Sequence, residues 1–171
     1  MKALSAKAKK FIKKVVAIIA ELTPDEERNG AVVAMLDTRD GPNVFPLTYK
    51  VGKIKKEKLH KYVFCAIEKS LRLLDNGAQR SGDSAEPNKH RYRGGVRIGQ
   101  HTIVAMSGFD SYVDEAGSVV IGAYLQAEEE NTSGGVDGLC ARGLELVDEF
   151  VVQTGASDNE NIYDFKRYFL T

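Results

Sequence analysis

The sequence predicts a mixed α/β domain, because segments with helical spacing of apolar residues alternate with short apolar runs typical of strands. Residues 31–36 form a continuous apolar run that is short enough for a buried strand. Residues 56–74 repeat apolar positions every three or four residues, as on one side of a helix. With 171 residues, 43% of them hydrophobic, the chain can form one core, so we expect a single domain over residues 1–171.

The first 20 residues predict an amphipathic helix. Its apolar side comprises Leu4, Ala8, Phe11, Ile12, Val15, Ile18 and Ile19. The five lysines between these positions are compatible with binding to an anionic membrane or nucleic acid, and with a solvated helix face, which we favour. The apolar run of residues 15–20 is too short for a signal peptide, and no stretch approaches the roughly 20 apolar residues of a membrane span. We therefore expect a cytoplasmic protein.

A β-hairpin is expected next. Residues 23–27 have the chemistry of a helix start, but Asn29-Gly30 limits that helix to one turn. Residues 31–36 and 44–51 are the two expected strands, and the Asp, Gly, Pro and Asn residues between them indicate a turn. Pro46 has no N–H to donate, which favours an edge position for the second strand.

The helix of residues 56–74 is the most regular element, and Asn76-Gly77 marks its end. Its expected apolar stripe comprises Leu59, Val63, Ala66, Ile67, Leu71 and Leu74. His60 lies on the polar side of this stripe and is expected at the surface. Cys65 and Cys140 lie in apolar helical patterns, so we expect buried free thiols in a reducing compartment. No cluster has the local ligand spacing that zinc requires.

Residues 78–93 form a polar connection whose length is typical of functional or mobile loops. Charged and aromatic residues gather at its end: Lys89, His90, Arg91, Tyr92 and Arg93, followed by Arg97. Guanidinium groups bind carboxylate and phosphate oxygens in pairs, so this cluster predicts a clamp for an anionic group. A site for single-stranded nucleic acid and a solvated loop are the alternatives.

A pair of short strands follows the loop. Gly94-Gly95 begins the first strand, Gly99-Gln100 makes the turn, and the second strand runs from His101 to residue 106. Ser107-Gly108 ends it, and small residues at such a point indicate the rim of a pocket. His101 has a partly apolar strand face and is either a ligand of haem or a metal ion, or a hydrogen-bonded strand residue. Ser107 has no G-x-S-x-G context, so no catalytic nucleophile is expected.

The acidic pair Asp114-Glu115 is expected at a helix start, where negative charge complements the helix dipole. Residues this close on a helix diverge by about 100° and cannot act together as an acid–base pair.

Residues 117–125 fit a strand or a helix, and we favour the helix although Gly117 and Gly122 weaken it. We expect a loop over residues 127–138, a helix over residues 139–152, and an aromatic tail over residues 162–170 that closes the core or docks on another subunit.

The balance of charge argues against one class of partner. Lys+Arg and Asp+Glu both number 24, so the net charge gives no whole-protein reason to expect nucleic acid. We therefore do not expect nucleic acid among the partners.

These motifs, in this order, resemble the family of haem-utilisation and corrinoid-associated domains typified by the GlcG and HbpS proteins. In that family a GG-x-P-I segment precedes a strand ending in VSG, and an acidic pair opens the last core helix. The matching residues here are Gly94, Gly95, Val96 and Ile98, then Ser107 and Gly108, then Asp114, Glu115 and Ala116. Arg97 stands where proline is usual, which puts the turn by the pocket in doubt. The resemblance covers roughly residues 5–127, and residues 128–171 are an extension without a counterpart.

The resemblance implies a profilin-like α/β (α+β) fold, with helices packed on the faces of an antiparallel sheet. It also implies a small-molecule-binding or sensory module, for haem in some members, that often assembles into homo-oligomers. We expect a non-enzymatic domain that binds a tetrapyrrole or another small anionic ligand near Gly94, Gly95, Ser107 and Gly108. Arg91, Arg93 or Arg97 would neutralise the ligand and His101 would lie nearby. The alternatives are an adaptor that uses its sheet edge and C-terminal tail, and an enzyme in which His101 or Asp114 carries a proton.

Overall fold

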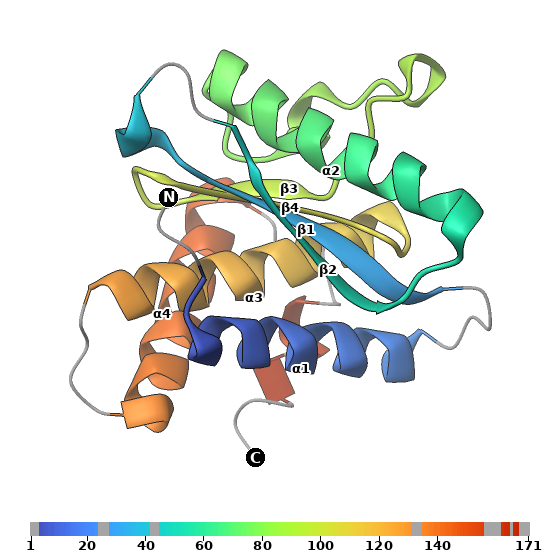
Figure 1. Ribbon diagram of the computed structural model, residues 1–171. Coiled ribbons are helices and arrows are strands. Elements are labelled where there is room, and N and C mark those ends of the chain that lie inside the picture. The colour runs from blue at the N-terminus through green and yellow to red at the C-terminus, as the bar shows by residue number, and fades with distance from the viewer. Residues whose placement is uncertain are drawn as a thin grey trace.

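A computed structural model describes residues 4–23, 28–41, 45–130, 135–155, 162–164 and 166–167. It contains four α-helices and four strands within these residues (Figure 1). In chain order they are α1 (Ala6–Leu22), β1 (Asn29–Asp37), β2 (Leu47–Lys53), α2 (Lys56–Asn76), β3 (Gly95–Ile98), β4 (Thr102–Ser107), α3 (Ser111–Glu129) and α4 (Gly135–Thr154). Among the described residues, no helix is both long enough and apolar enough to cross a membrane.

The strands form one antiparallel sheet in the order β2-β1-β4-β3. Helix α2 covers one face of the sheet, while α1 and α3 cover the other and α4 packs against α3 (Figure 1). This arrangement confirms the predicted class, an antiparallel sheet with helices packed on its faces. The expected hairpin is β1 with β2, and β2 is an edge strand that begins directly after Pro46.

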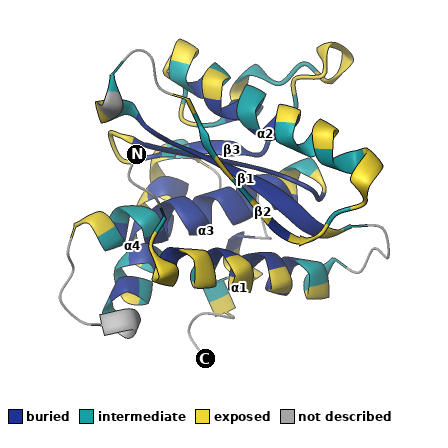
Figure 2. Ribbon diagram, in the orientation of Figure 1, coloured by how far each residue is buried: buried dark blue, intermediate teal, exposed yellow. Residues whose placement is uncertain are grey.

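The central strand β1 explains why its sequence is apolar without interruption. Ala31, Val33 and Met35 face the large core shared with α1, α3 and α4. Val32 and Ala34 face α2, on the other side of the sheet. Because side chains alternate along a strand, a strand that is covered on both faces needs apolar residues at every position. Figure 2 shows this strand buried along its length.

Helix α2 has the predicted bounds to within two residues, but its predicted stripe is partly wrong. The buried residues are Cys65, Ala66, Lys69, Ser70 and Leu73, whereas Leu71 is 37% exposed. The helix is therefore rotated so that a lysine faces the protein interior. A buried cation is tolerated only when it has a charged or hydrogen-bonding partner, and apolar periodicity does not show which residue that partner is.

Residues 117–125 are helical, as favoured, and lie within α3. The two glycines allow this helix to approach the sheet closely. A Cβ at Gly117 would lie 2.6 Å from Met106 Cε, and a Cβ at Gly122 would lie 2.7 Å from Ile98 Cγ1. Close packing therefore offsets the low helix propensity of glycine.

The predicted loop over residues 127–138 is wrong at both ends, because α3 continues to Glu129 and α4 begins at Gly135. Ile162, in the predicted tail, is 1% exposed and belongs to the core of this chain.

The predicted turn of residues 23–27 lies mainly outside the described residues. Cys65 is buried, Cys140 is half-buried, and no disulfide joins them.

Arg72 of α2 holds the connection between α2 and β3 in place. Its guanidinium donates to the carbonyl oxygens of Ser81 at 2.7 Å, Ser84 at 2.9 Å and Tyr92 at 2.6 Å. The Nε atom donates to Glu68 Oε1 at 2.8 Å, and the arginine side chain is only 9% exposed. One side chain thus satisfies three loop carbonyls, which gives a polar connection a fixed path.

We predict that Arg72→Ala lowers the free energy of unfolding by about 3 kcal/mol, because several nearly buried carbonyl groups and Glu68 lose their charged donor. Urea unfolding measures this effect. Arg142→Ala is the matched control, since Arg142 pairs with Glu130, Glu145 and Glu149 at a site where the arginine is 29% exposed, and the loss should be below about 1 kcal/mol. Equal losses in the two variants would contradict the role assigned to Arg72.

Candidate functional site

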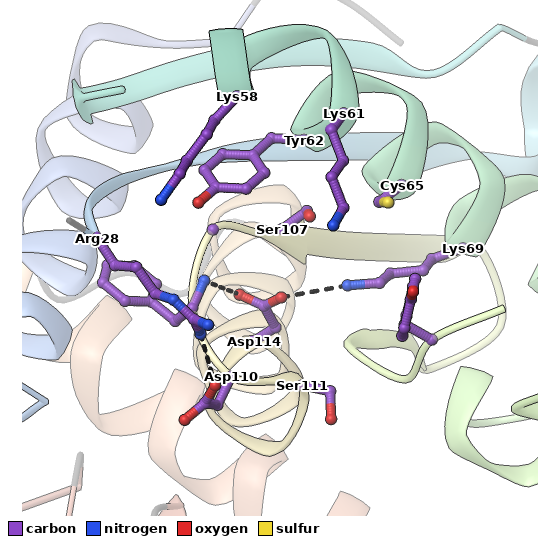
Figure 3. A pocket seen from close by; sticks show the side chains of 13 residues that line it. Arg28, Lys58, Lys61, Tyr62, Cys65, Lys69, Ser107, Asp110, Ser111 and Asp114 are labelled. Carbon is purple, nitrogen blue, oxygen red and sulfur yellow. Dashed lines mark hydrogen bonds and ion pairs between the residues drawn. The ribbon is translucent and has the colours of Figure 1, made fainter. Parts of the chain in front are cut away.

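A pocket of about 390 Å³ lies between α2 and the segment that joins β4 to α3. Lys58, Lys61 and Tyr62 of α2 form one wall, and Ser107 at the end of β4 and Asp110 before α3 lie opposite (Figure 3). Gly108 also lines the pocket. Arg28, directly before β1, closes the rim. The volume falls within the range of small-molecule sites, and the lining residues come from separate parts of the chain.

The deepest charged groups of this pocket are Lys69 and Asp114. Lys69 Nζ lies 3.2 Å from Asp114 Oδ2 and donates to the carbonyl oxygen of Met106 at 2.7 Å. The two side chains are 2% and 3% exposed. The pair connects α2 to α3 and to the last residues of β4 (Figure 3). Burial makes each charge depend on the other, since an unpaired charge in a protein interior is strongly unfavourable.

Asp114 is also bonded to the backbone that precedes its own helix. Its Oδ1 atom accepts a hydrogen bond of 3.0 Å from the N–H of Phe109. Burial raises the pKa of this carboxyl from its ordinary value of 3.8 to about 6, although Lys69 and the backbone donors act in the opposite direction. Both carboxylate oxygens therefore have partners, and the group stabilises the turn between β4 and α3.

Gly94 makes space for this ion pair. It has a φ of +121°, and a Cβ there would lie 2.6 Å from Lys69 Nζ and 2.8 Å from Asp114 Cβ. Its carbonyl oxygen accepts hydrogen bonds from Ser118 Oγ and from the N–H of Met106, both at 2.9 Å. The predicted importance of Gly94 thus has a structural cause, which is the close approach of backbone to a buried lysine.

Positive charge dominates the mouth of the pocket. Lys58 and Lys61 extend into it from α2, while Arg28 contacts Asp110 at 2.5 Å (Figure 3). Asp110 is the residue before α3, and its side chain makes no capping hydrogen bond to that helix. With four cations and two carboxylates among its lining residues, the pocket carries a net positive charge next to a helix N-terminus. This arrangement can bind an anionic group.

Only two of the predicted site residues, Ser107 and Gly108, line this pocket; Gly94 lies behind the ion pair. The N–H of Gly95 donates to Ser81 Oγ at 2.8 Å. His101 is exposed, at the opposite end of β4, in a hollow with Gln126 and Glu129. The structure therefore does not bring His101 together with Ser107 and Gly108.

The three predicted arginines have other contacts. Arg97 donates to the carbonyl oxygen of Leu73 at 2.6 Å near the end of α2, where positive charge complements the helix dipole. Arg93 lies 4.1 Å above the ring centre of Tyr112, and Arg91 pairs with Glu86 at 3.1 Å. None of these arginines lines the pocket.

The four cations that do line the pocket were missed from the sequence: Arg28, Lys58, Lys61 and Lys69. Lys69 carried a usable signal, because it follows Cys65 and precedes Leu73 at helical spacing on a buried side. A lysine within such a stripe indicates a buried partner. Lys58 and Lys61 carry no comparable signal, since a lysine on the polar side of a helix is usually solvated.

Glu115, expected as a negative charge at the helix start, is 2% exposed. Its Oε1 atom lies 3.7 Å from Arg80 Nε, and Oε2 has no hydrogen-bond partner among the described residues. Burial raises the pKa of Glu115, and Arg80 and Arg93 oppose the rise. Asp114 and Glu115 thus diverge toward separate cations, as the helical angle predicts.

The lining residues fit an anion better than a metal or a haem iron. Within the described residues, no group of three His, Cys, Asp or Glu side chains is placed to hold a metal ion. None of the three histidines of the chain lines the pocket. Burial raises the pKa of the Cys65 thiol, which disfavours the thiolate that a metal would need.

No protein-family model and no curated protein matches this sequence. A solved structure, the crystal structure of a PduOC–heme complex, is similar with a TM-score of 0.43 and 15% sequence identity, over 68% of this chain and 90% of that chain. The family resemblance noted in the sequence therefore stays a prediction.

We predict that Lys69→Met lowers the free energy of unfolding by about 3–5 kcal/mol, because it leaves the Asp114 carboxylate buried without its cation. The double variant Lys69→Met/Asp114→Asn should be less destabilised than Lys69→Met, since the amide that replaces the carboxylate can still accept from the N–H of Phe109 and carries no charge. Lys61→Met, at the exposed mouth, is the control and should change stability by less than about 0.5 kcal/mol. A loss below about 1 kcal/mol for Lys69→Met would show that the pair is not energetically coupled.

The raised pKa of Asp114 predicts a pH dependence of stability. Between the ordinary value of 3.8 and about 6, the folded protein binds a proton that the unfolded chain has released, so stability falls as pH rises through this window. Across this window the free energy of unfolding falls by about 3 kcal/mol in total. Above the window this contribution of Asp114 no longer changes with pH. Urea unfolding from pH 4 to 7 should therefore show wild-type stability falling relative to Asp114→Asn. Parallel curves for the two proteins would contradict the burial of a titrating Asp114.

Proposed function

We propose that this protein binds a small anionic molecule, bearing a carboxylate or phosphate group, in the pocket between α2 and the start of α3. The observation that carries the proposal is the convergence of Arg28, Lys58 and Lys61 on one cavity beside a helix N-terminus. Charge-assisted hydrogen bonds from such groups are stronger than neutral ones, and helix N-termini favour anions. The buried Lys69–Asp114 ion pair forms the bottom of this pocket.

The same contacts support binding rather than catalysis. Both oxygens of Asp114 accept hydrogen bonds, so this carboxylate is poorly placed to carry protons for a substrate. His101, the other candidate proton carrier, lines a different hollow. A tetrapyrrole is less compatible than a compact anion, because four cations line the pocket and none of the three histidines does.

A second candidate, an adaptor or self-associating module, is favoured by the outer side of α2. Phe64 is 62% exposed and Leu71 is 37% exposed, and both line a groove of about 560 Å³ with Ile67. Exposed apolar side chains that gather in a groove are typical of protein contacts. Strand β2 adds an edge position, as the adaptor hypothesis requires. A cytoplasmic location and a homo-oligomeric state are part of this proposal.

Calorimetric titration with inorganic phosphate, pyrophosphate and malonate tests anion binding. We expect at least one to bind, and Lys61→Gln to weaken it by about tenfold, the effect of one charge-assisted hydrogen bond. Lys56→Gln is the matched control, because Lys56 is exposed on the same helix but does not line the pocket.

Two outcomes would overturn the proposal. One is the absence of binding for all three anions, and the other is an equal effect of Lys61→Gln and Lys56→Gln. Titration with haemin distinguishes the tetrapyrrole version, since a shifted Soret band that persists in Lys61→Gln would place haem binding elsewhere than in this pocket.

A further inference from the structure

Over its first nine residues, the exposed side of α1 carries only positive charge. From Ala6 to Lys14, the exposed residues are Ala6, Lys7, Lys9, Lys10, Lys13 and Lys14. Figure 2 shows this outer side exposed along the helix, while the inner side is buried. Helix α1 contains five of the 24 basic residues of the chain and one of its 24 acidic residues, so it carries +4 while the remainder carries −4. The balanced total conceals a strong segregation of charge.

This segregation opposes the stability of the helix itself. Lys9 and Lys13 are four residues apart, and Lys7 and Lys10 are three apart, so like charges lie next to each other on the surface. The first turn contains no acidic residue to complement the helix dipole. Lys7, Lys9, Lys10 and Lys13 form no ion pair with another described residue. Locally unfavourable patterns of this kind concentrate at functional surfaces.

The exposed lysines of α1 form two rows. Lys9 and Lys13 make one row, and Lys7 and Lys10 make the other, which Lys14 continues. Ala6 and Ala17 are exposed at the two ends of the lysine segment. A partner that lies along this face would therefore meet cations on both sides of the helix.

We propose that this face of α1 binds the phosphate backbone of duplex DNA without reading its sequence. A helix of about 10–12 Å diameter fits a major groove about 12 Å wide, and the two lysine rows then face phosphates at both edges. The major groove of duplex RNA is too narrow for this contact. The face offers no exposed aromatic side chain for stacking on single strands, because Phe11 is half-buried and stacks on Tyr124 at 3.8 Å.

An anionic membrane is the weaker partner for this helix. Membrane-surface helices insert their apolar side between lipid headgroups. The apolar side of α1 is committed to the protein core, where Ile12 and Ile19 are fully buried. Only long-range attraction to lipid would remain, whereas DNA offers a groove that matches both lysine rows.

Fluorescence anisotropy with a labelled duplex of about 20 base pairs tests the proposal on the full chain. If Lys7, Lys9, Lys10 and Lys13 each neutralise one phosphate, the slope of log K against log salt is about −3.6. Affinity should then fall about 150-fold between 50 and 200 mM salt. Lys7→Gln/Lys10→Gln and Lys9→Gln/Lys13→Gln should each reduce that slope by about 1.8, because each removes two of these four lysines.

Lys53→Gln/Lys56→Gln is the matched control, since it removes two exposed lysines outside α1 and should leave the slope unchanged. Glutamine is a good helix former, and circular dichroism checks that each variant keeps its helix content. Absence of DNA binding at 50 mM salt, or equal losses in the control and the α1 variants, would overturn the proposal. So would binding to phosphatidylserine vesicles without binding to DNA. None of these variants alters the pocket between α2 and α3, so anion binding there is tested separately.

Discussion

The buried ion pair between Lys69 and Asp114 is the contact on which the rest of the structure depends. Lys69 comes from the helix on one side of the sheet, and Asp114 comes from the helix on the other side. The lysine also donates a hydrogen bond to the carbonyl oxygen of Met106, near the end of β4. Gly94 leaves space for its ammonium group. The buried pair thus holds together α2, the residue before β3, the end of β4 and the start of α3, and the pocket lies directly above it.

The sequence predicted most of the fold because the strongest signals are local. Strand β1 is covered on both faces, so its uninterrupted apolar run identified it. The turn residues around it located the hairpin, and Gly77 marked the end of α2. The rotation of α2 was missed because it depends on a tertiary contact across 45 residues. The glycines of α3 were ambiguous for the same reason, since their packing partners Met106 and Ile98 belong to other elements.

The candidate site was harder to predict than the fold. Ser107 and Gly108 were found because small residues end a strand there, and both do line the pocket. Arg93 and Arg97 were predicted to bind a ligand because guanidinium groups bind anions. In the structure Arg93 packs on the ring of Tyr112, and Arg97 donates to a carbonyl oxygen near the end of α2. Lysines on the polar side of a helix give no sequence signal for a pocket, because the same pattern describes a solvated surface. Convergence in space, rather than residue type, distinguishes Lys58 and Lys61.

The burial of β1 on two faces also has a consequence for how the chain reaches its folded state. Residues 31–36 form six consecutive apolar residues without charge or proline, the composition typical of segments that aggregate when exposed. One face of this strand is covered by α2, whose residues follow it in the chain. During synthesis, β1 is therefore made before α2, the helix that covers one of its faces. The lysine-rich helix that precedes it supplies like-charge repulsion between nascent chains during that interval.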